Sequence, residues 1–133
     1  MASVLKVDSI TGVTTAGSVS VQGEGSATTN LQQGLAKAWN SVASQASTDS
    51  FNVSSVTDVS AGQLEDNFTN NFAAATYSSP ACAGGGSNIQ TFIATNWYDA
   101  AKYTTSLSRT GTYLNATGYT DSDFYVARFG DLA

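Results

Sequence analysis

The chain has 133 residues, enough for one domain with a single core, and only 11% of them are charged. Ser, Thr, Asn and Gly replace the Lys and Glu that decorate exposed helices, which predicts an all-β fold. A net charge of −5, with only five basic residues, argues against a nucleic-acid partner. There is no apolar run of about 18 residues, so no membrane span is expected.

The first segment, residues 1–29, consists of short alternating apolar runs interrupted by glycine. Its apolar residues are too sparse to build a core of their own. We predict an extended N-terminal arm that pairs with a neighbouring subunit or partner, with Leu5, Val7 and Ile10 as alternating anchors. Composition leaves a disordered tail open as the alternative. The segment lacks the features of a signal peptide, so synthesis and folding in a cytoplasm are expected.

Residues 30–47 fit two patterns. Leu31, Leu35 and Ala38 have the spacing of one or two helical turns. Alternation through Leu35, Lys37 and Trp39 suits a strand equally well. Periodicity alone leaves both structures open.

From residue 49 the alternation is typical of strands. Residues 50–57 alternate apolar and polar side chains up to Asp58, Ala61-Gly62 is a candidate turn, and residues 63–69 form the next predicted strand. A further strand is expected from residues 72–77 onward, and Pro80 ends it.

The second half of the chain continues in the same way. Residues 83–88 predict a glycine-rich loop. Strands are expected at 89–96, 102–110, 112–117 and 123–130. In the last of them Phe124, Val126 and Arg128 alternate with Tyr125, Ala127 and Phe129. Many short strands spaced by about ten residues predict an antiparallel β-sandwich over 30–133, with a jelly-roll-like topology.

Several motifs resemble a domain of virion proteins from tailed, especially marine, bacteriophages. In that pattern a Lys-Ala-Trp strand precedes a Ser-Phe-Asn-Val-Ser-Ser strand, a Gly-containing turn, an Asn-Phe-Thr strand, an Ala-x-Tyr element and a closing strand that ends in Phe-Gly. The matching residues are 37–39, 50–55, Gly62, 67–69, 75–77 and 129–130. Residues 5–10 also look like the opening of many short phage structural proteins. The aromatic and glycine spacer that usually follows the Trp strand is replaced by residues 40–43.

The resemblance favours a strand from about Leu35. It also implies a non-enzymatic structural protein on the virion surface, as a capsid decoration or a short fibre. The implied partners are other virion proteins, in a capsid or a tail, and the implied assembly is a homotrimer. The alternative is a tail-fibre protein that binds host glycans.

Candidate catalytic and metal-binding residues are few, because the chain contains no histidine and therefore no Ser-His or Cys-His dyad. Asp121 and Asp123, with Asp99, could act as an acid–base pair or bind calcium, but acidic residues in turns mostly cap the turn itself. Glu65 and Asp66 are adjacent on a predicted strand, so they should face opposite ways. We predict no catalytic residue, cofactor or metal site.

Three further features have structural and functional interpretations. Cys82 has no neighbouring base or cation, so a small buried apolar side chain is the favoured interpretation over a reactive thiol. The glycines at 84–86 lack the Lys-Ser/Thr of a phosphate-binding loop. Trp97 and Tyr98 lie between two predicted strands, where they are expected in the core or a subunit interface, with glycan contact as the alternative.

Overall fold

The computed structural model describes residues 5–13, 19–22, 26, 28–31, 34–84, 91–95, 100–114 and 118–133. The chain divides into two compact units, Met1–Leu35 and Ala36–Ala133. In the first unit, β1 (Ser20–Gln22) pairs antiparallel with β2 (Thr28–Asn30). The domain boundary predicted after residue 29 and the extended form of the arm stay predictions.

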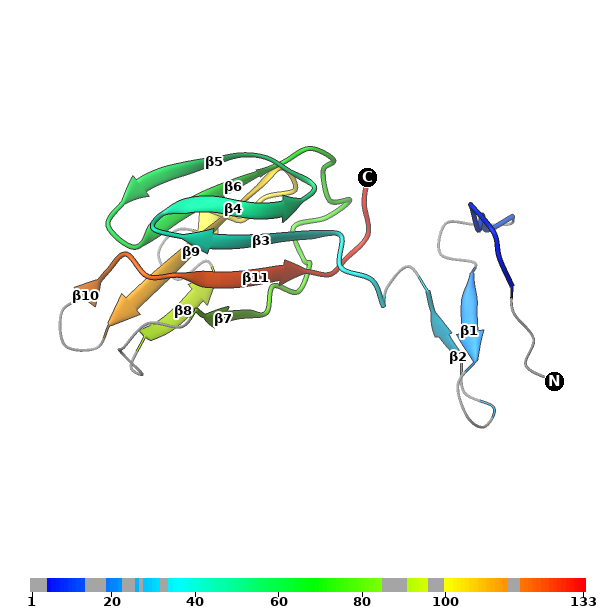
Figure 1. Ribbon diagram of the computed structural model, residues 1–133. Helices are drawn as coiled ribbons and strands as arrows, with labels where there is room; N and C mark the ends of the chain where they lie inside the picture. The colour runs from blue at the N-terminus through cyan, green and yellow to red at the C-terminus, as the bar shows by residue number, and fades with distance from the viewer. Residues whose placement is uncertain are drawn as a thin grey trace. The chain divides into compact units, whose positions relative to one another are not determined.

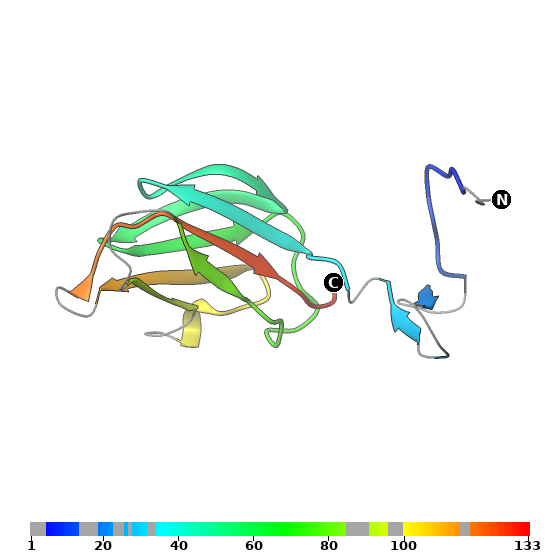
Figure 2. The same ribbon diagram turned by 60° about the horizontal axis from the view of Figure 1, so that its bottom comes forward.

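The second unit, which we call the main unit, contains two antiparallel sheets (Figure 1). The β3 sheet has the order β4 (Ala46–Phe51), β3 (Ala38–Ala43), β11 (Phe124–Arg128), β7 (Ala81–Ala83). The β6 sheet has the order β5 (Val53–Ser60), β6 (Gln63–Phe68), β9 (Leu107–Leu114), β10 (Gly118–Tyr119), with β8 (Thr91–Thr95) also on β9. In Figure 2, β11 (red) runs between β3 (cyan) and β7 (green). Apart from the 3-10 turn η1 (Ala100–Lys102), the described residues contain no helix, which confirms the all-β prediction. The jelly-roll-like topology stays a prediction.

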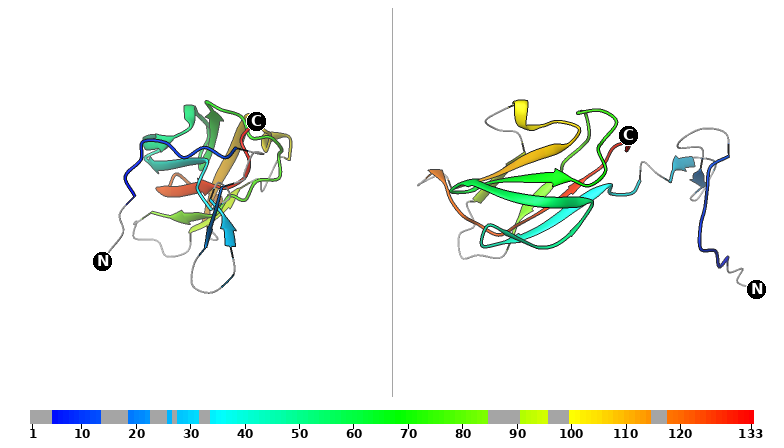
Figure 3. Two further views of the ribbon diagram at one scale, coloured as in Figure 1. Left: turned by 90° about the vertical axis from the view of Figure 1, so that its right-hand side faces the viewer. Right: turned by 90° about the horizontal axis from the view of Figure 1, so that it is seen from above.

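The core lies between the two sheets. Figure 3 shows the sheets from one end (left) and from above (right). Two apolar clusters draw on both sheets. The first contains Ala38, Phe68, Phe72 and Tyr77, with Tyr103 packed against it. The second contains Val42, Leu64, Phe124 and Val126, with Val56 and Ala81 packed against it. Each sheet alone is too small to bury its apolar face, so face-to-face packing is what makes the fold stable.

A layer of polar side chains separates the two clusters. On β3, Asn40 lies between Ala38 of one cluster and Val42 of the other, and on β6, Asp66 lies in the same way between Phe68 and Leu64. We call this set the polar layer; its members are Asn40, Asp66, Thr110 and Arg128. Alternation along each strand places every member on the inner face, where the Asp66 carboxylate accepts hydrogen bonds from both Asn40 and Arg128.

The predicted strand over 50–57 is interrupted, because Asn52 has a φ of 57° and separates β4 from β5. Its side-chain Nδ2 donates to the carbonyl oxygens of Lys37 and Asn70, both at 3.0 Å, and its Oδ1 accepts the Asn70 N–H at 2.7 Å. Asparagine tolerates this left-handed conformation better than most residues. The chain therefore turns from the β3 sheet into the β6 sheet at this corner.

Residues 38–43 form a strand and not a helix, and Gly62 (φ 66°) lies in the predicted turn. Residues 72–77 are not a strand, since Phe72 makes only an isolated bridge to Leu132. The strand predicted over 102–110 begins only at Leu107, and its continuation merges with the one predicted from 112 into β9. Residues 85–90, which include most of the predicted glycine-rich loop, lie outside the described residues.

Tyr77 makes the stability of the main unit sensitive to alkaline pH. Its ring stacks on Phe72 with centroids 4.2 Å apart, and burial raises the pKa of Tyr77 from 10.0 to about 12. Between these pH values the unfolded chain has released the proton while the folded chain retains it, so stability falls as pH rises. We expect a loss of about 2 kcal/mol over this window, measured by urea unfolding. Tyr77→Phe should flatten the pH dependence, and an unchanged slope would contradict the assignment.

Candidate functional site: an aromatic groove on the β3 sheet

The outer face of the β3 sheet carries apolar side chains, although it is turned away from the core. On β3, Ala38, Asn40 and Val42 are buried, so alternation places Trp39 and Ser41 on the outer face. The prediction for β11 is confirmed, because Phe124, Val126 and Arg128 are all buried. The other face of β11 therefore presents Tyr125 and Ala127 outward.

Strand register brings these outward side chains into two rows. In the first row, Tyr125 of β11 lies opposite Ser41 of β3 on one side and Cys82 of β7 on the other, and Ser41 in turn lies opposite Asp49 of β4. In the second row, Trp39 of β3 lies opposite Phe51 of β4 and Ala127 of β11. Directly opposed residues share one face of a sheet, so both rows line the same surface.

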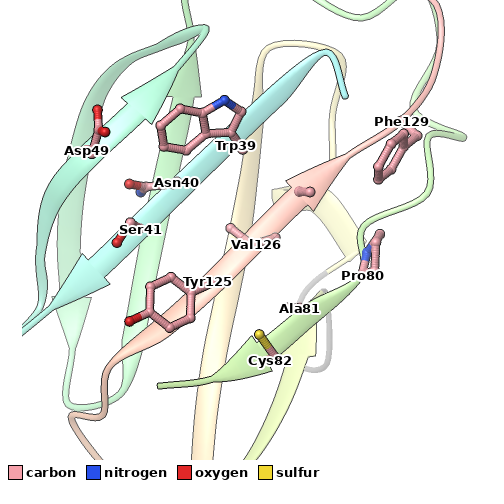
Figure 4. Close-up of a pocket in the computed structure, with 11 residues that line it drawn as sticks. Trp39, Asn40, Ser41, Asp49, Pro80, Ala81, Cys82, Tyr125, Val126 and Phe129 are labelled. Carbon is pink, nitrogen blue, oxygen red and sulfur yellow. The ribbon is translucent and has the colours of Figure 1, made fainter. Parts of the chain in front are cut away.

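The two rows enclose an open groove of about 600 Å³ (Figure 4), which we call the aromatic groove. Its lining includes Trp39, Ser41, Asp49, Pro80, Tyr125 and Phe129. Tyr125 keeps 49% of its surface exposed, and Phe51, which lies opposite Trp39, keeps 52%. Tyr125 shares the hollow with the partly exposed rings of Trp39 and Phe129, and Phe51 lies beside it. Such a cluster is typical of a binding surface, since isolated surface hydrophobics need no explanation but clustered ones do.

Polar groups lie beside the aromatic rings on the β4 side. The Asp49 side chain is exposed, and its Oδ1 accepts the N–H of Ser50 at 2.9 Å. The hydroxyl of Ser41 shares a hydrogen bond of 2.9 Å with that of Thr48. Asp49 is the one charged side chain among the described residues that line the groove. The site therefore offers aromatic surface together with hydrogen-bond acceptors and a single negative charge.

Cys82 corrects one prediction. Its thiol is free and the residue is exposed, not buried. The reason is its position opposite Tyr125, on the outer face of the short strand β7. Cys82 therefore forms part of the groove lining.

The site residues predicted from sequence do not coincide with this groove. Trp97 and Tyr98 lie outside the described residues. Leu5, Val7 and Ile10 belong to the N-terminal unit, where all three are exposed and Leu5 keeps 80% of its surface accessible. The prediction missed the groove because it considered Trp39 only as part of a strand motif. The available signal was apolar residues on both faces of 123–130, which indicates a strand whose outer face is also used.

The acidic residues considered for catalysis or calcium binding hold loops in place. Asp121 Oδ1 accepts hydrogen bonds from the N–H of Gly62 at 2.6 Å and from Gln45 Nε2 at 2.7 Å. Asp123 Oδ1 accepts the N–H of Ser44 at 3.1 Å. Both carboxylates thus fasten distant turns to the start of β11.

Glu65 and Asp66 point to opposite faces of β6, as expected. Glu65 pairs with Arg109 on the neighbouring strand and with Lys102 at 3.4 Å. Burial alone would raise the pKa of Glu65, but Arg109 and Lys102 outweigh it and hold the pKa below its ordinary value. Asp66 points into the polar layer and pairs with Arg128 at 2.6 Å.

Across the described ranges, no three His, Cys, Asp or Glu side chains come together as a metal-binding group. The same ranges contain no helix of the length and apolarity needed to cross a membrane. Comparison with protein-family models, with curated proteins and with solved structures found no match for the chain.

Proposed function

We propose that the chain is a structural protein of a bacteriophage virion, displayed on the particle surface as a capsid decoration or a short fibre. In this proposal the N-terminal unit attaches to another virion protein in the capsid or the tail, and the main unit faces outward. The protein assembles as a homotrimer and carries out no catalysis.

The observation that supports the proposal is the division of the chain after Leu35. The main unit has its own core, whereas the first unit exposes Leu5, Val7 and Ile10. Apolar side chains that find no core in their own chain are suited to bind a neighbour, and strand addition supplies backbone hydrogen bonds for such a contact.

The link to a virion comes from the sequence motifs at 37–39 and 50–55. In the fold these motifs form one corner, where Asn52 of the second motif donates to the carbonyl of Lys37 in the first. Motif residues that bond to one another and to the backbone are suited to a scaffold role.

Truncation of the N-terminal unit tests the proposal. We expect deletion of residues 1–25 to leave a folded main unit that no longer enters particles, because the anchoring side chains are lost. Circular dichroism checks the fold, and immunogold labelling of virions checks incorporation and distinguishes capsid from tail. The matched full-length variant replaces Leu5, Val7 and Ile10 by Asp. Normal incorporation of both variants would refute the anchoring role.

A second candidate function is receptor binding, in which the displayed protein contacts glycans on the host. The aromatic groove is the observation that favours it, since Trp39 and Tyr125 lie on an outer face of the main unit. Particles that carry Tyr125→Ala should assemble in normal yield and adsorb poorly to host cells. Unchanged adsorption would count against this second role and leave the structural one intact.

A further inference from the structure

The two central rings of the aromatic groove stand on one face of the sheet, with small residues beside them. Trp39 and Tyr125 stand diagonally across β3 and β11, and the other diagonal is occupied by the small residues Ser41 and Ala127. Diagonal positions on a sheet are about 7–8 Å apart. Neither ring packs on another aromatic among the described residues, in contrast to the ring pairs of the core and to the Tyr113–Tyr119 pair of the β6 sheet. The rings therefore border a hollow in which a ligand can lie.

The size of the hollow favours a small ligand over a protein surface. Its volume of about 600 Å³ is within the range of about 300–1,000 Å³ that small-molecule sites occupy. A stable protein interface needs roughly 800 Å² from each partner, spread over a broader surface. One or two units of a chain-like ligand would fill the groove.

The charge of the groove restricts the chemistry of that ligand. Asp49 is the one charged group that lines it within the described part of the chain, and the whole chain has a net charge of −5. The negative charge of Asp49 and the negative net charge of the chain both disfavour phosphate and acidic sugars. The exposed Asp49 carboxylate has no hydrogen to donate, so a ligand that bonds to it must bring donors.

An organic cation would also satisfy a carboxylate beside aromatic rings. A cation site, however, gathers its rings around one point. Here the rings stand on one face of a sheet at diagonal positions, so they offer two separate surfaces. A flat ligand with polarised C–H groups and a hydroxyl edge fits this arrangement better, because the face of an aromatic ring carries partial negative charge.

We propose that the aromatic groove binds a neutral saccharide, which lies on Trp39 and Tyr125 and donates hydroxyl hydrogen bonds to Asp49. This inference deepens the receptor-binding candidate and rests on it for a biological role. The binding itself is a property of the purified chain, so it is tested without particles.

The test is a titration of the full chain with neutral oligosaccharides of glucose, galactose, mannose and N-acetylglucosamine, followed by tryptophan fluorescence. We expect at least one of these probes to change the emission of Trp39. Trp39→Phe should abolish the signal and leave only the emission of Trp97. Tyr125→Ala and Asp49→Asn should each weaken binding about tenfold, measured by calorimetry.

Tyr113→Ala is the matched control, because Tyr113 is a partly exposed tyrosine of β9 in the other sheet. It should bind as tightly as the unchanged chain, and sialyllactose should not bind. The proposal fails if no neutral probe binds, or if the Tyr113 and Tyr125 variants bind equally well. Binding of tetramethylammonium alone would identify a cation site instead. Self-association that Tyr125→Ala abolishes would identify the groove as an interface between copies. Failure of saccharide binding leaves particle incorporation, which is measured separately on virions, unaffected.

Discussion

Asp66→Ala should reduce the free energy of unfolding by about 3–5 kcal/mol, because it breaks a buried ion pair. Asp66 and Arg128 are 1% and 0% exposed, and Arg128 Nη2 donates to Asp66 Oδ2 at 2.6 Å across the two sheets. Removing the carboxylate leaves the guanidinium charge buried without its counter-charge. Domains of this size have total stabilities of about 5–15 kcal/mol, so the variant should approach the limit of folding.

The surroundings of Arg128 leave little to replace the carboxylate. Its Nε and Nη1 have no hydrogen-bond partner in the described part of the chain, and Thr110 Oγ1 lies 3.5 Å from Nη2. The Phe68 ring lies 5.3 Å from the guanidinium carbon and gives a favourable cation–π contact. Asn40 also loses the acceptor of its Nδ2, which is 2.7 Å from Asp66 Oδ1. The loss therefore spreads through the whole polar layer.

Urea unfolding of three variants measures this effect. Lys102→Met is the matched control, because it breaks a partly exposed ion pair with Glu65 and should cost less than about 1 kcal/mol. Arg128→Met added to Asp66→Ala should recover part of the loss, since the unpaired charge is then gone. If Asp66→Ala is no more harmful than Lys102→Met, the polar layer does not hold the sheets together.

The positions of most strands could be predicted from alternation, because alternation depends only on local sequence. The pattern of 123–130 placed Arg128 on the same face as Phe124 and Val126, and all three are buried. The ion pair that stabilises the buried Arg128 could not be predicted, since its partner Asp66 lies 62 residues away in sequence. Sequence showed only that Glu65 and Asp66 face opposite ways.

The errors of prediction share a physical origin in long-range contacts. Alternation continues through Asn52, so local sequence gives no sign of the corner that depends on Lys37 and Asn70. Cys82 was expected in the core, but pairing with Tyr125 places it outside. The groove arises from the register of four strands, and single-sequence periodicity contains no information on register between strands.

The β5–β6 turn leads to the second large prediction, namely that Gly62→Ala should destabilise the main unit by about 3 kcal/mol. Gly62 has a φ of 66°, a conformation that costs a side-chain-bearing residue roughly 1–2 kcal/mol. Overpacking adds to this strain, because a Cβ at Gly62 would lie 2.6 Å from both Thr112 O and Thr120 N. Both atoms belong to the backbone, so neither can rotate away.

The turn cannot shift as a whole, because it is bonded on several sides. The Gly62 carbonyl accepts the N–H of Thr112 at 2.8 Å, and its own N–H donates to Asp121 at 2.6 Å. Asp121 also accepts from Gln45 in the β3–β4 turn. Any displacement of Gly62 therefore breaks hydrogen bonds that join both sheets at this end of the main unit.

Gly118→Ala separates strain from steric conflict. Gly118 has a φ of 88°, but a Cβ there would meet no atom within 4 Å. Its substitution should thus cost only roughly 1–2 kcal/mol, the conformational part alone. Thermal and urea unfolding of the two variants under identical conditions measures the difference. Equal losses would mean that the backbone around Gly62 yields to a methyl group, and that the bonds from Asp121 and Thr112 do not fix the turn.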